Sequence, residues 1–337
     1  MILIIPLLSL ISAFILGCII TNKTSLKTSS FAYLFFAISL GFIIFTAINY
    51  YFSLILSFPT GIIVAQFTIL FFEIFYIFYR KPLIRPLGYL NDLLKEKLLM
   101  ILIIVIGGIL FILFRNHIIP SINGDLYTGE STYGDLPFHL STISSIAYGQ
   151  RFPPDNPMYA GTQLVYPYLI NFFSAILVYE GWSLRLAIII PGLILSLALI
   201  GMIYELAFIL TKNRLKSFLS VIFYFFNGGL GFYFFLKDYS FNISSIFQAL
   251  FNPTLLKEYS HLFEQNIQWG NFISRMIIPE RSLIFGIPAG IIILRLLFFR
   301  EANKQPSIFD LILTSFLISL MPLLHTHTVL AFMLILP

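Results

Sequence analysis

The chain reads LLMILIIVIGGILFILF at Leu98–Phe114 and, a few residues later, GDLYTGESTYGDLPFH at Gly124–His139. The first segment is an apolar run of about the length that a membrane-spanning helix needs. The second is the most polar and most acidic run in the chain, and it contains Asp125, Glu130 and Asp135. A span that leads directly into an acidic loop predicts that this loop lies just outside the bilayer and that the other spans hold it there.

The composition indicates an integral membrane protein. Of the 337 residues, 58% are hydrophobic and only 10% are charged, whereas soluble domains carry roughly 25% charged residues. The net charge of +5 does not indicate nucleic-acid binding, because Lys and Arg gather in the cytoplasmic loops of membrane proteins. Cys18 is the single cysteine, so disulfides within the chain are excluded and a cysteine-based metal site is disfavoured.

Apolar segments of spanning length recur along the chain and predict an all-α fold, a polytopic transmembrane helix bundle. Residues 1–20 are predicted to be a retained helix, because no basic region precedes them as in a signal peptide. The chain ends at Pro337 inside an apolar run that is too short to span, so we expect the sequence to be a piece of a longer protein. The predicted spans are Met1–Ile20, Phe31–Leu56, Pro59–Tyr79, Leu98–Phe114, Leu184–Leu210, Ser217–Leu236, Leu283–Phe299 and Ile308–Leu324.

Loop charge sets the predicted orientation. The basic loops Arg80–Lys97 and Thr211–Lys216 should be cytoplasmic, and the loop after Phe114 should lie outside. Between these loops the chain must cross the membrane an odd number of times. We therefore predict that Leu164–Tyr179, the shorter and more polar of the two apolar segments there, lies in the outer interface. The amphipathic run Leu136–Tyr148 is predicted to be a second interfacial helix.

The chain is predicted to fall into two parts. N-terminal helices at 1–97 precede a core at 98–337, whose outer loops are 115–183 and 237–282. No Walker-type or Rossmann glycine pattern is present. The run Gly228-Gly229-Leu230-Gly231 falls within a predicted span, where small residues permit close helix packing.

The order of a span, an acidic outer loop, two interfacial helices and an outer-to-inner span resembles the GT-C superfamily of integral-membrane glycosyltransferases. This superfamily includes protein O-mannosyltransferases and the aminoarabinose transferases of lipid A. The motif that carries the resemblance is Gly134-Asp135-Leu136-Pro137-Phe138-His139, followed by the turn Gln150–Pro157 and by Tyr166-Pro167-Tyr168. The resemblance spans roughly Leu98–Pro337, and Leu136 stands where the family often has a second acid.

The resemblance implies an enzyme of the plasma membrane. It would transfer a sugar from a polyprenyl-phosphate donor to a glycan, lipid or protein acceptor at the outer face, by an inverting displacement with a carboxylate base. The absence of a soluble domain long enough for a nucleotide sugar also favours a lipid-linked donor. A divalent cation is left open, and no other cofactor is predicted.

Asp135 is the predicted base, because a carboxylate at the water–lipid boundary can take the proton of an acceptor hydroxyl. The alternative interpretation is a helix cap, with Pro137 in the first turn. His139 falls one turn later on the same helix face. The full set of candidates for the acceptor site is Asp125, His139, Tyr166, His325 and His327. The candidates for binding the carrier phosphate are Arg275, Arg281 and Arg151, since Arg binds phosphate bidentately.

Each of these assignments has a plainer alternative. Asp125 and Glu130 are also typical of a solvated loop, and an Arg at a helix end can simply extend to water. His325 and His327 can face one ligand only if the helix breaks between them. A transporter or flippase for a lipid or polyol, and an outer-face glycan polymerase or ligase, remain the alternative functions. Glu73, Glu205 and Asp310 lie within apolar segments, and snorkelling, protonation or helix pairing accounts for them.

Overall fold

The structure is a computed structural model that describes residues 4–28, 30–80, 86–129, 132–251, 259, 262–299 and 305–335. It is 76% helical. The strands within the described residues, β1 (Ser121–Ile122) and β2 (Asp125–Leu126), form one short antiparallel pair. The all-α prediction therefore agrees with the structure, apart from a small hairpin in the acidic loop.

Among the described residues, five helices are long and apolar enough to cross a membrane. All five fall on predicted spans, and each follows a long apolar run; α8 continues through Pro191. They are α1 (Ile4–Thr21), α2 (Tyr33–Leu56), α3 (Phe58–Arg80), α5 (Lys97–His117) and α8 (Leu184–Thr211).

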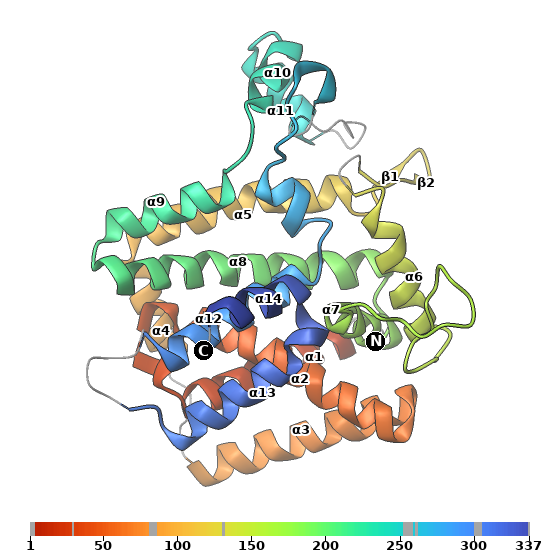
Figure 1. Cartoon of the computed structure of the whole chain (residues 1–337), viewed down its shortest axis with the longest axis vertical. Coiled ribbons are helices and arrows are strands. Elements are labelled where there is room, and N and C mark those ends of the chain that lie inside the picture. The colour runs from red at the N-terminus through yellow and green to blue at the C-terminus, as the bar shows by residue number, and fades with distance from the viewer. Residues whose placement is uncertain are drawn as a thin grey trace.

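The bundle has two ends that differ in their polar groups. Arg185, at the start of α8, donates hydrogen bonds to the carbonyls of Ile118 (3.0 Å) and Arg115 (2.7 Å) at the end of α5. At the opposite end Arg214 binds Glu96. We call these the Asp135 end, where α6 (Asp135–Ala147) and the hairpin lie, and the Arg214 end, where α4 (Pro86–Lys95) lies; they are at the right and left of Figure 1.

Close packing between α1 and α2 follows from two glycines. A Cβ on Gly17 would stand 1.8 Å from the carbonyl oxygen of Ala37, and a Cβ on Gly41 would stand 2.0 Å from that of Ala13. Small residues let helix backbones approach in this way. One hydrophobic cluster then runs from Leu10 to Phe332 and joins the N-terminal helices to the remainder of the chain.

The segment predicted to lie in the outer interface is instead enclosed by protein. It forms α7 (Leu169–Tyr179), which has only 11 residues and is too short to span, but every residue from Leu169 to Val178 is buried. Phe172 and Phe173 pack against aromatic rings of α2 and α3. A helix that is apolar all round is buried rather than laid on a surface, so the interfacial prediction for Leu164–Tyr179 is wrong.

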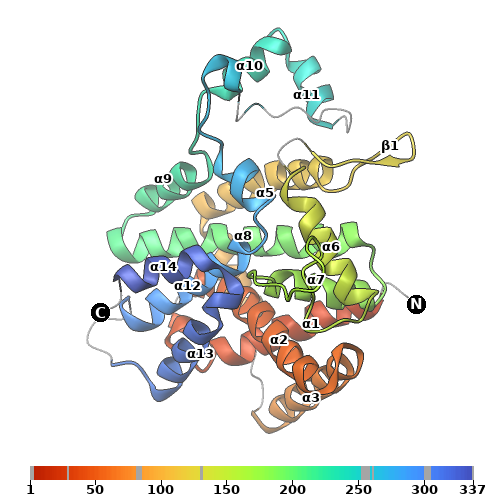
Figure 2. The same cartoon turned by 45° about the vertical axis from the view of Figure 1, so that its right-hand side comes forward.

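The predicted span Ser217–Leu236 is also wrong. α9 (Arg214–Phe225) ends early, and α10 (Gly231–Asp238) and α11 (Ile243–Phe251) project from the bundle in both views (Figures 1 and 2). Gly228 has φ +137°, which only glycine adopts easily, and the N–H of Gly229 donates to the carbonyl of Trp269 at 3.0 Å. The glycine run is therefore a turn and not a packing motif.

The C-terminal helices are shorter than the five long spans. The chain passes through a π-helical turn, η4 (Ile273–Ile277), into α12, and α13 is separated from α14 by a break at His325. Short 3₁₀ turns lie elsewhere in the chain: η1 (Ser25–Thr28), η2 (Ser30–Ala32) and η3 (Phe263–Gln265). The bounds of the last helices are α12 (Leu283–Leu297), α13 (Ile308–Leu324) and α14 (Thr326–Ile335).

Two of the acids within apolar segments are bound by helix partners or caps, as the sequence interpretation allows. Glu205 on α8 pairs with Arg295 on α12 at 2.9 Å, and both side chains are buried. Asp310 forms a capping box with Ser307 at the start of α13 and also accepts from the backbone N–H of Ser25. The third acid, Glu73, accepts a hydrogen bond from Ser12.

Candidate functional site

Four segments that are distant in sequence meet at the Asp135 end. The start of α6 supplies Asp135, the loop before α7 supplies Tyr166, the segment before α12 supplies Glu280, and the first turn of α14 supplies His327. The charges of Glu280 and Asp135 both act on the Tyr166 phenol, and those of Asp135 and His327 act on Glu280. These four side chains therefore share one electrostatic environment, and we call them the mouth cluster.

Asp135 is an exposed carboxylate in the first turn of α6. The N-cap of this helix is Gly134, and no side chain caps it. The capping interpretation of Asp135 is thus not observed in the structure. α6 therefore presents a carboxyl group that is open to solvent.

Tyr166 and Glu280 hold their protons more tightly than exposed groups do. Burial raises the pKa of Tyr166 to about 12, and the charges of Glu280 and Asp135 add to this effect. Burial also raises the pKa of the half-buried Glu280, with the Asp135 charge acting in the same direction and His327 acting against it. A raised carboxyl pKa near other ionisable groups is typical of sites of acid–base chemistry.

A buried hydrogen-bond network lies beneath the mouth cluster. Asn171 bridges two elements: its Nδ2 lies 3.0 Å from Nδ1 of His139, and its Oδ1 accepts from Nη1 of Arg281 at 2.9 Å. Nη2 of Arg281 donates to Oγ of Ser174 at 2.7 Å, and that hydroxyl donates to the carbonyl of Ala187 at 2.6 Å. The network fixes α6, α7, α8 and the Glu280 segment relative to one another.

The network also determines the state of the imidazole. His139 is hydrogen-bonded to the backbone carbonyl of Pro279, and burial lowers its pKa to about 3, with the charge of Arg281 adding to this effect. Because a carbonyl can only accept, the imidazole donates to Pro279 and accepts from Asn171 through its other nitrogen. His139 is therefore a neutral structural group and not an open ligand.

Arg281, predicted to bind a carrier phosphate, is enclosed. Its side chain is only 2% exposed, and burial lowers its pKa to about 9. The guanidinium is directed to Asn171 and Ser174 within the protein. Through these two hydrogen bonds Arg281 fixes the segment that carries Glu280 to α7. The polar residues of α7 that bind it could have been noticed only as polar interruptions of an apolar run.

His325 and His327 meet because the helix breaks at His325, which has extended backbone angles. The two rings lie 5.3 Å apart. His325 is buried and shares a hydrogen bond of 2.8 Å with Thr328, whereas His327 is exposed. A Cβ on Gly286 would come within 2.1 Å of the His325 Cβ, so α12 and the break are in close contact. The condition under which both histidines could face one site is therefore met.

The remaining predicted residues lie elsewhere. Asp125 is exposed in the β1–β2 hairpin. Arg151 forms an exposed ion pair with Asp155 at 3.1 Å. Arg275 lies in η4, where its side chain packs against Gly270. Glu130 falls outside the described residues.

A cavity of about 690 Å³ adjoins the segment that leads into Asp135. Its lining includes Asn116 and His117 at the end of α5, together with apolar side chains of α5 and α10. The Thr132 hydroxyl donates to the His117 carbonyl at 3.1 Å, and the Gly129 N–H donates to the same oxygen at 3.2 Å. Asp135 itself is not among the lining residues of this cavity.

Comparison of the chain with models of protein families, with curated proteins and with solved structures finds no match. The function therefore has to be inferred from the side chains themselves.

Within the described part of the chain, no three His, Cys, Asp or Glu side chains are grouped closely enough to hold a metal ion. The divalent cation that the sequence leaves open is therefore not assigned to any residues. At the mouth cluster the Tyr166 hydroxyl and the His327 imidazole are available as hydrogen-bonding groups rather than as metal ligands.

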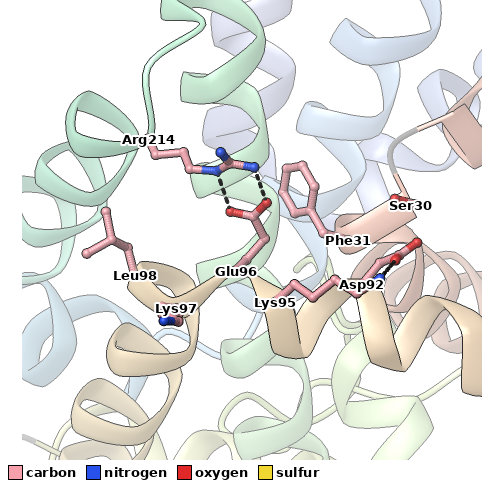
Figure 3. A pocket seen from close by; sticks show the side chains of 8 residues that line it. All are labelled: Ser30, Phe31, Asp92, Lys95, Glu96, Lys97, Leu98 and Arg214. Carbon is pink, nitrogen blue, oxygen red and sulfur yellow. Dashed lines mark hydrogen bonds and ion pairs between the residues drawn. The ribbon is translucent and has the colours of Figure 1, made fainter.

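A pocket of about 440 Å³ at the Arg214 end differs in character from the mouth cluster (Figure 3). Four of its five charged residues form ion pairs: Arg214 binds both oxygens of Glu96 at 2.8 and 2.7 Å, and Lys95 pairs with Asp92 at 2.9 Å. The bidentate pair joins the corner between α4 and α5 to the start of α9. We interpret this pocket as a structural junction.

Proposed function

We propose that the chain is a membrane-embedded glycosyltransferase that takes a sugar from a polyprenyl-phosphate donor. The observation that supports this proposal most strongly is the exposed carboxyl group of Asp135, whose charge acts on Tyr166 and Glu280, at the end of the bundle opposite the basic loops. A lipid-linked donor and a water-borne acceptor meet at such a boundary. The resemblance of the Gly134–His139 motif to the GT-C superfamily supports the same reaction class.

In the proposed reaction Asp135 takes the proton from an acceptor hydroxyl as its oxygen attacks the anomeric carbon. The bond between that carbon and the phosphate oxygen breaks, and its electron pair leaves with the polyprenyl phosphate. The sugar configuration inverts in this single displacement. A positioned base contributes typically 10²–10⁴-fold to the rate.

The structure modifies the roles of the residues around this base in our proposal. Arg281 holds the Glu280 segment in place through Asn171, and Arg275 is the remaining candidate on this segment for the carrier phosphate. His327 and Tyr166, next to Glu280, are candidates for contact with the acceptor.

The proposal is tested by the release of polyprenyl phosphate from a panel of polyprenyl-phosphate hexoses and pentoses. The assay is run in native membranes, which supply an acceptor for the sugar, so this readout does not require that the acceptor be identified. Asp135→Asn should lower the release at least about 100-fold. Asp92→Asn, which neutralises an exposed acid at the Arg214 end, should leave it unchanged. A folded Asp135→Asn variant with wild-type release would exclude Asp135 as the base.

Transport of a lipid or polyol is a second candidate, favoured by charged groups inside the helix bundle. Glu205 and Arg295 form a buried pair between α8 and α12, and transporters use ionisable groups at membrane depth. Uptake of a polyol or lipid by liposomes containing the chain, without release of polyprenyl phosphate, would favour this function. A glycan polymerase or ligase would share the chemistry of the first proposal and differ in acceptor.

A further inference from the structure

A groove between α1 and α3 has a polar floor although it faces the side of the bundle. Both helices pack on α2, and α3 lies at one edge of the bundle in both views (Figures 1 and 2). The cavity between them has a volume of about 330 Å³. This volume falls at the lower end of the roughly 300–1,000 Å³ found for small-ligand sites.

Glu73 lines this floor, and Glu180, at the end of α7, lies beside it. Each carboxylate is bound by a serine of α1 that lines the cavity. Oγ of Ser9 donates to Oε1 of Glu180 at 2.7 Å, and Nε2 of Gln66 on α3 donates to the same oxygen. One turn along α1, Oγ of Ser12 donates to Oε1 of Glu73 at 2.9 Å. Glu73 is only 2% exposed. Thus α1 and α3 both place polar side chains on one cavity in an otherwise apolar region.

The floor offers acceptors and very few donors. The hydroxyl protons of Ser9 and Ser12 are already committed to the two carboxylates, so their oxygens present lone pairs. Oε2 of Glu180 is buried and has no hydrogen-bond partner among the described residues. No Lys or Arg is among the described lining residues. Such a site is complementary to a group that carries positive charge and several donors.

The side chains at the walls of the groove indicate the chemistry of the rest of the ligand. Leu8 and Ile11 on α1, and Ile63 and Phe67 on α3, line the cavity and are about half exposed or more. In a membrane these side chains contact acyl chains. Contacts between transmembrane helices favour small residues at the interface, whereas these rims are large, so a lipid-like chain fits the groove better than a partner helix.

We propose that the α1–α3 groove binds the ammonium group of a long-chain amine amphiphile, with its chain along the apolar walls. Glu73 on the floor and Glu180, which lies behind Ser9 and Gln66, would be the counter-charges. Burial raises the pKa of Glu180 to about 7. A raised pKa is expected of a buried carboxyl group before a cation binds beside it. The site uses α1 and α3 and none of the mouth-cluster residues, so it stands independently of the proposed transferase activity.

The probe for this site is dodecylamine, with dodecanol at the same mole fraction as the uncharged control. The full chain in dodecyl maltoside is heated at increasing concentrations of each amphiphile. Dodecylamine should raise the unfolding midpoint and dodecanol should not. In Glu73→Gln and Glu180→Gln the half-saturating concentration of dodecylamine should rise at least about tenfold. Glu264→Gln, at an exposed acid distant in sequence, should respond like the wild type.

Ser12→Leu serves as a second variant, because it keeps both carboxylates and fills the groove. It should abolish the response to dodecylamine even if a Gln variant fails to fold. Equal stabilisation by dodecylamine and dodecanol would overturn the proposal, as would a wild-type response in the folded Gln variants. No stabilisation of the wild type would also overturn it and would favour a basic residue of a partner helix as the occupant.

Discussion

Nδ2 of Asn171 donates a hydrogen bond to Nδ1 of His139 across 3.0 Å. The bond joins α7 to α6 and leaves Oδ1 of the same amide to accept from Arg281. Asn171 is therefore the residue through which the helix that carries Asp135 is fixed to the segment that carries Glu280.

Replacing Asn171 with Leu should destabilise the protein by about 3 kcal/mol, because a buried guanidinium and a buried imidazole each lose a partner. Chemical unfolding in detergent measures the loss. Gln163→Ala removes an exposed amide and should change the free energy of unfolding by no more than about 0.5 kcal/mol. If the two substitutions had equal effects, the network would not hold the site together.

His139 predicts a specific dependence of stability on pH. The unfolded imidazole takes up a proton near pH 6.5, and the folded imidazole does so only near pH 3. The stability contributed by the neutral ring is complete above about pH 6.5 and is lost as the pH falls toward 3. Between about pH 6.5 and pH 5 the loss should be about 2 kcal/mol, at 1.36 kcal/mol per pH unit.

Unfolding curves at pH 7 and pH 5 measure this slope. His139→Gln should show a smaller slope than the wild type, whereas His327→Gln should retain the full slope. An unchanged slope in His139→Gln would show that the ring is not the source of the acid sensitivity.

A matched pair of glycines tests the contact between α12 and the helix break. A Cβ on Gly286 would come within 2.1 Å of the His325 Cβ, whereas a Cβ on Gly108 would have no atom within 4 Å. Gly286→Ala should cost about 1–3 kcal/mol through overpacking and should displace His325 and His327. Gly108→Ala should be neutral or slightly stabilising, because Ala favours helix over Gly. Thermal unfolding of both variants measures the difference. Equal shifts of the two unfolding midpoints would contradict this packing.

The buried pair of Glu205 and Arg295 should be costly to break from one side. Arg295→Met leaves an uncompensated carboxylate between α8 and α12, for which the expected loss is about 3–5 kcal/mol. The double variant Glu205→Met and Arg295→Met should recover most of that loss. Lys95→Met, which breaks an exposed pair with Asp92, should cost less than about 1 kcal/mol. A double variant no more stable than Arg295→Met would argue against this account of the pair.

The long helices could be predicted from the sequence because each is a continuous apolar run, which the bilayer length requirement makes easy to interpret. The burial of α7 could not be predicted in this way. The sequence places this segment at the interface because it is the shorter and more polar of two apolar segments. Only the packing of Phe172 and Phe173 against other helices shows that the 11-residue helix is enclosed. The end of α9 was also missed, because Gly228 was interpreted as a packing residue and its positive φ is a property of the turn.

The candidate site was predictable in part. Asp135 is identified by its place between an apolar run and a short helix. In the structure its charge acts on Tyr166, and that of His327 acts on the neighbouring Glu280. The support from Arg281 was not predictable, since it depends on Asn171 and Ser174, which lie more than 100 positions away in the chain. Pairwise contacts over such separations leave no periodic pattern in a single sequence.

The central claim is that Asp135 lies at the exterior water boundary and that the Arg214 end faces the cytoplasm. Single cysteines at Tyr133, which is 73% exposed, and at Lys212 test this claim in a Cys18→Ser background. A membrane-impermeant maleimide is applied to intact cells and then to permeabilised cells. Tyr133→Cys should be labelled in intact cells and Lys212→Cys only after permeabilisation. Labelling of both positions under the same condition, or in the reverse order, would contradict the account.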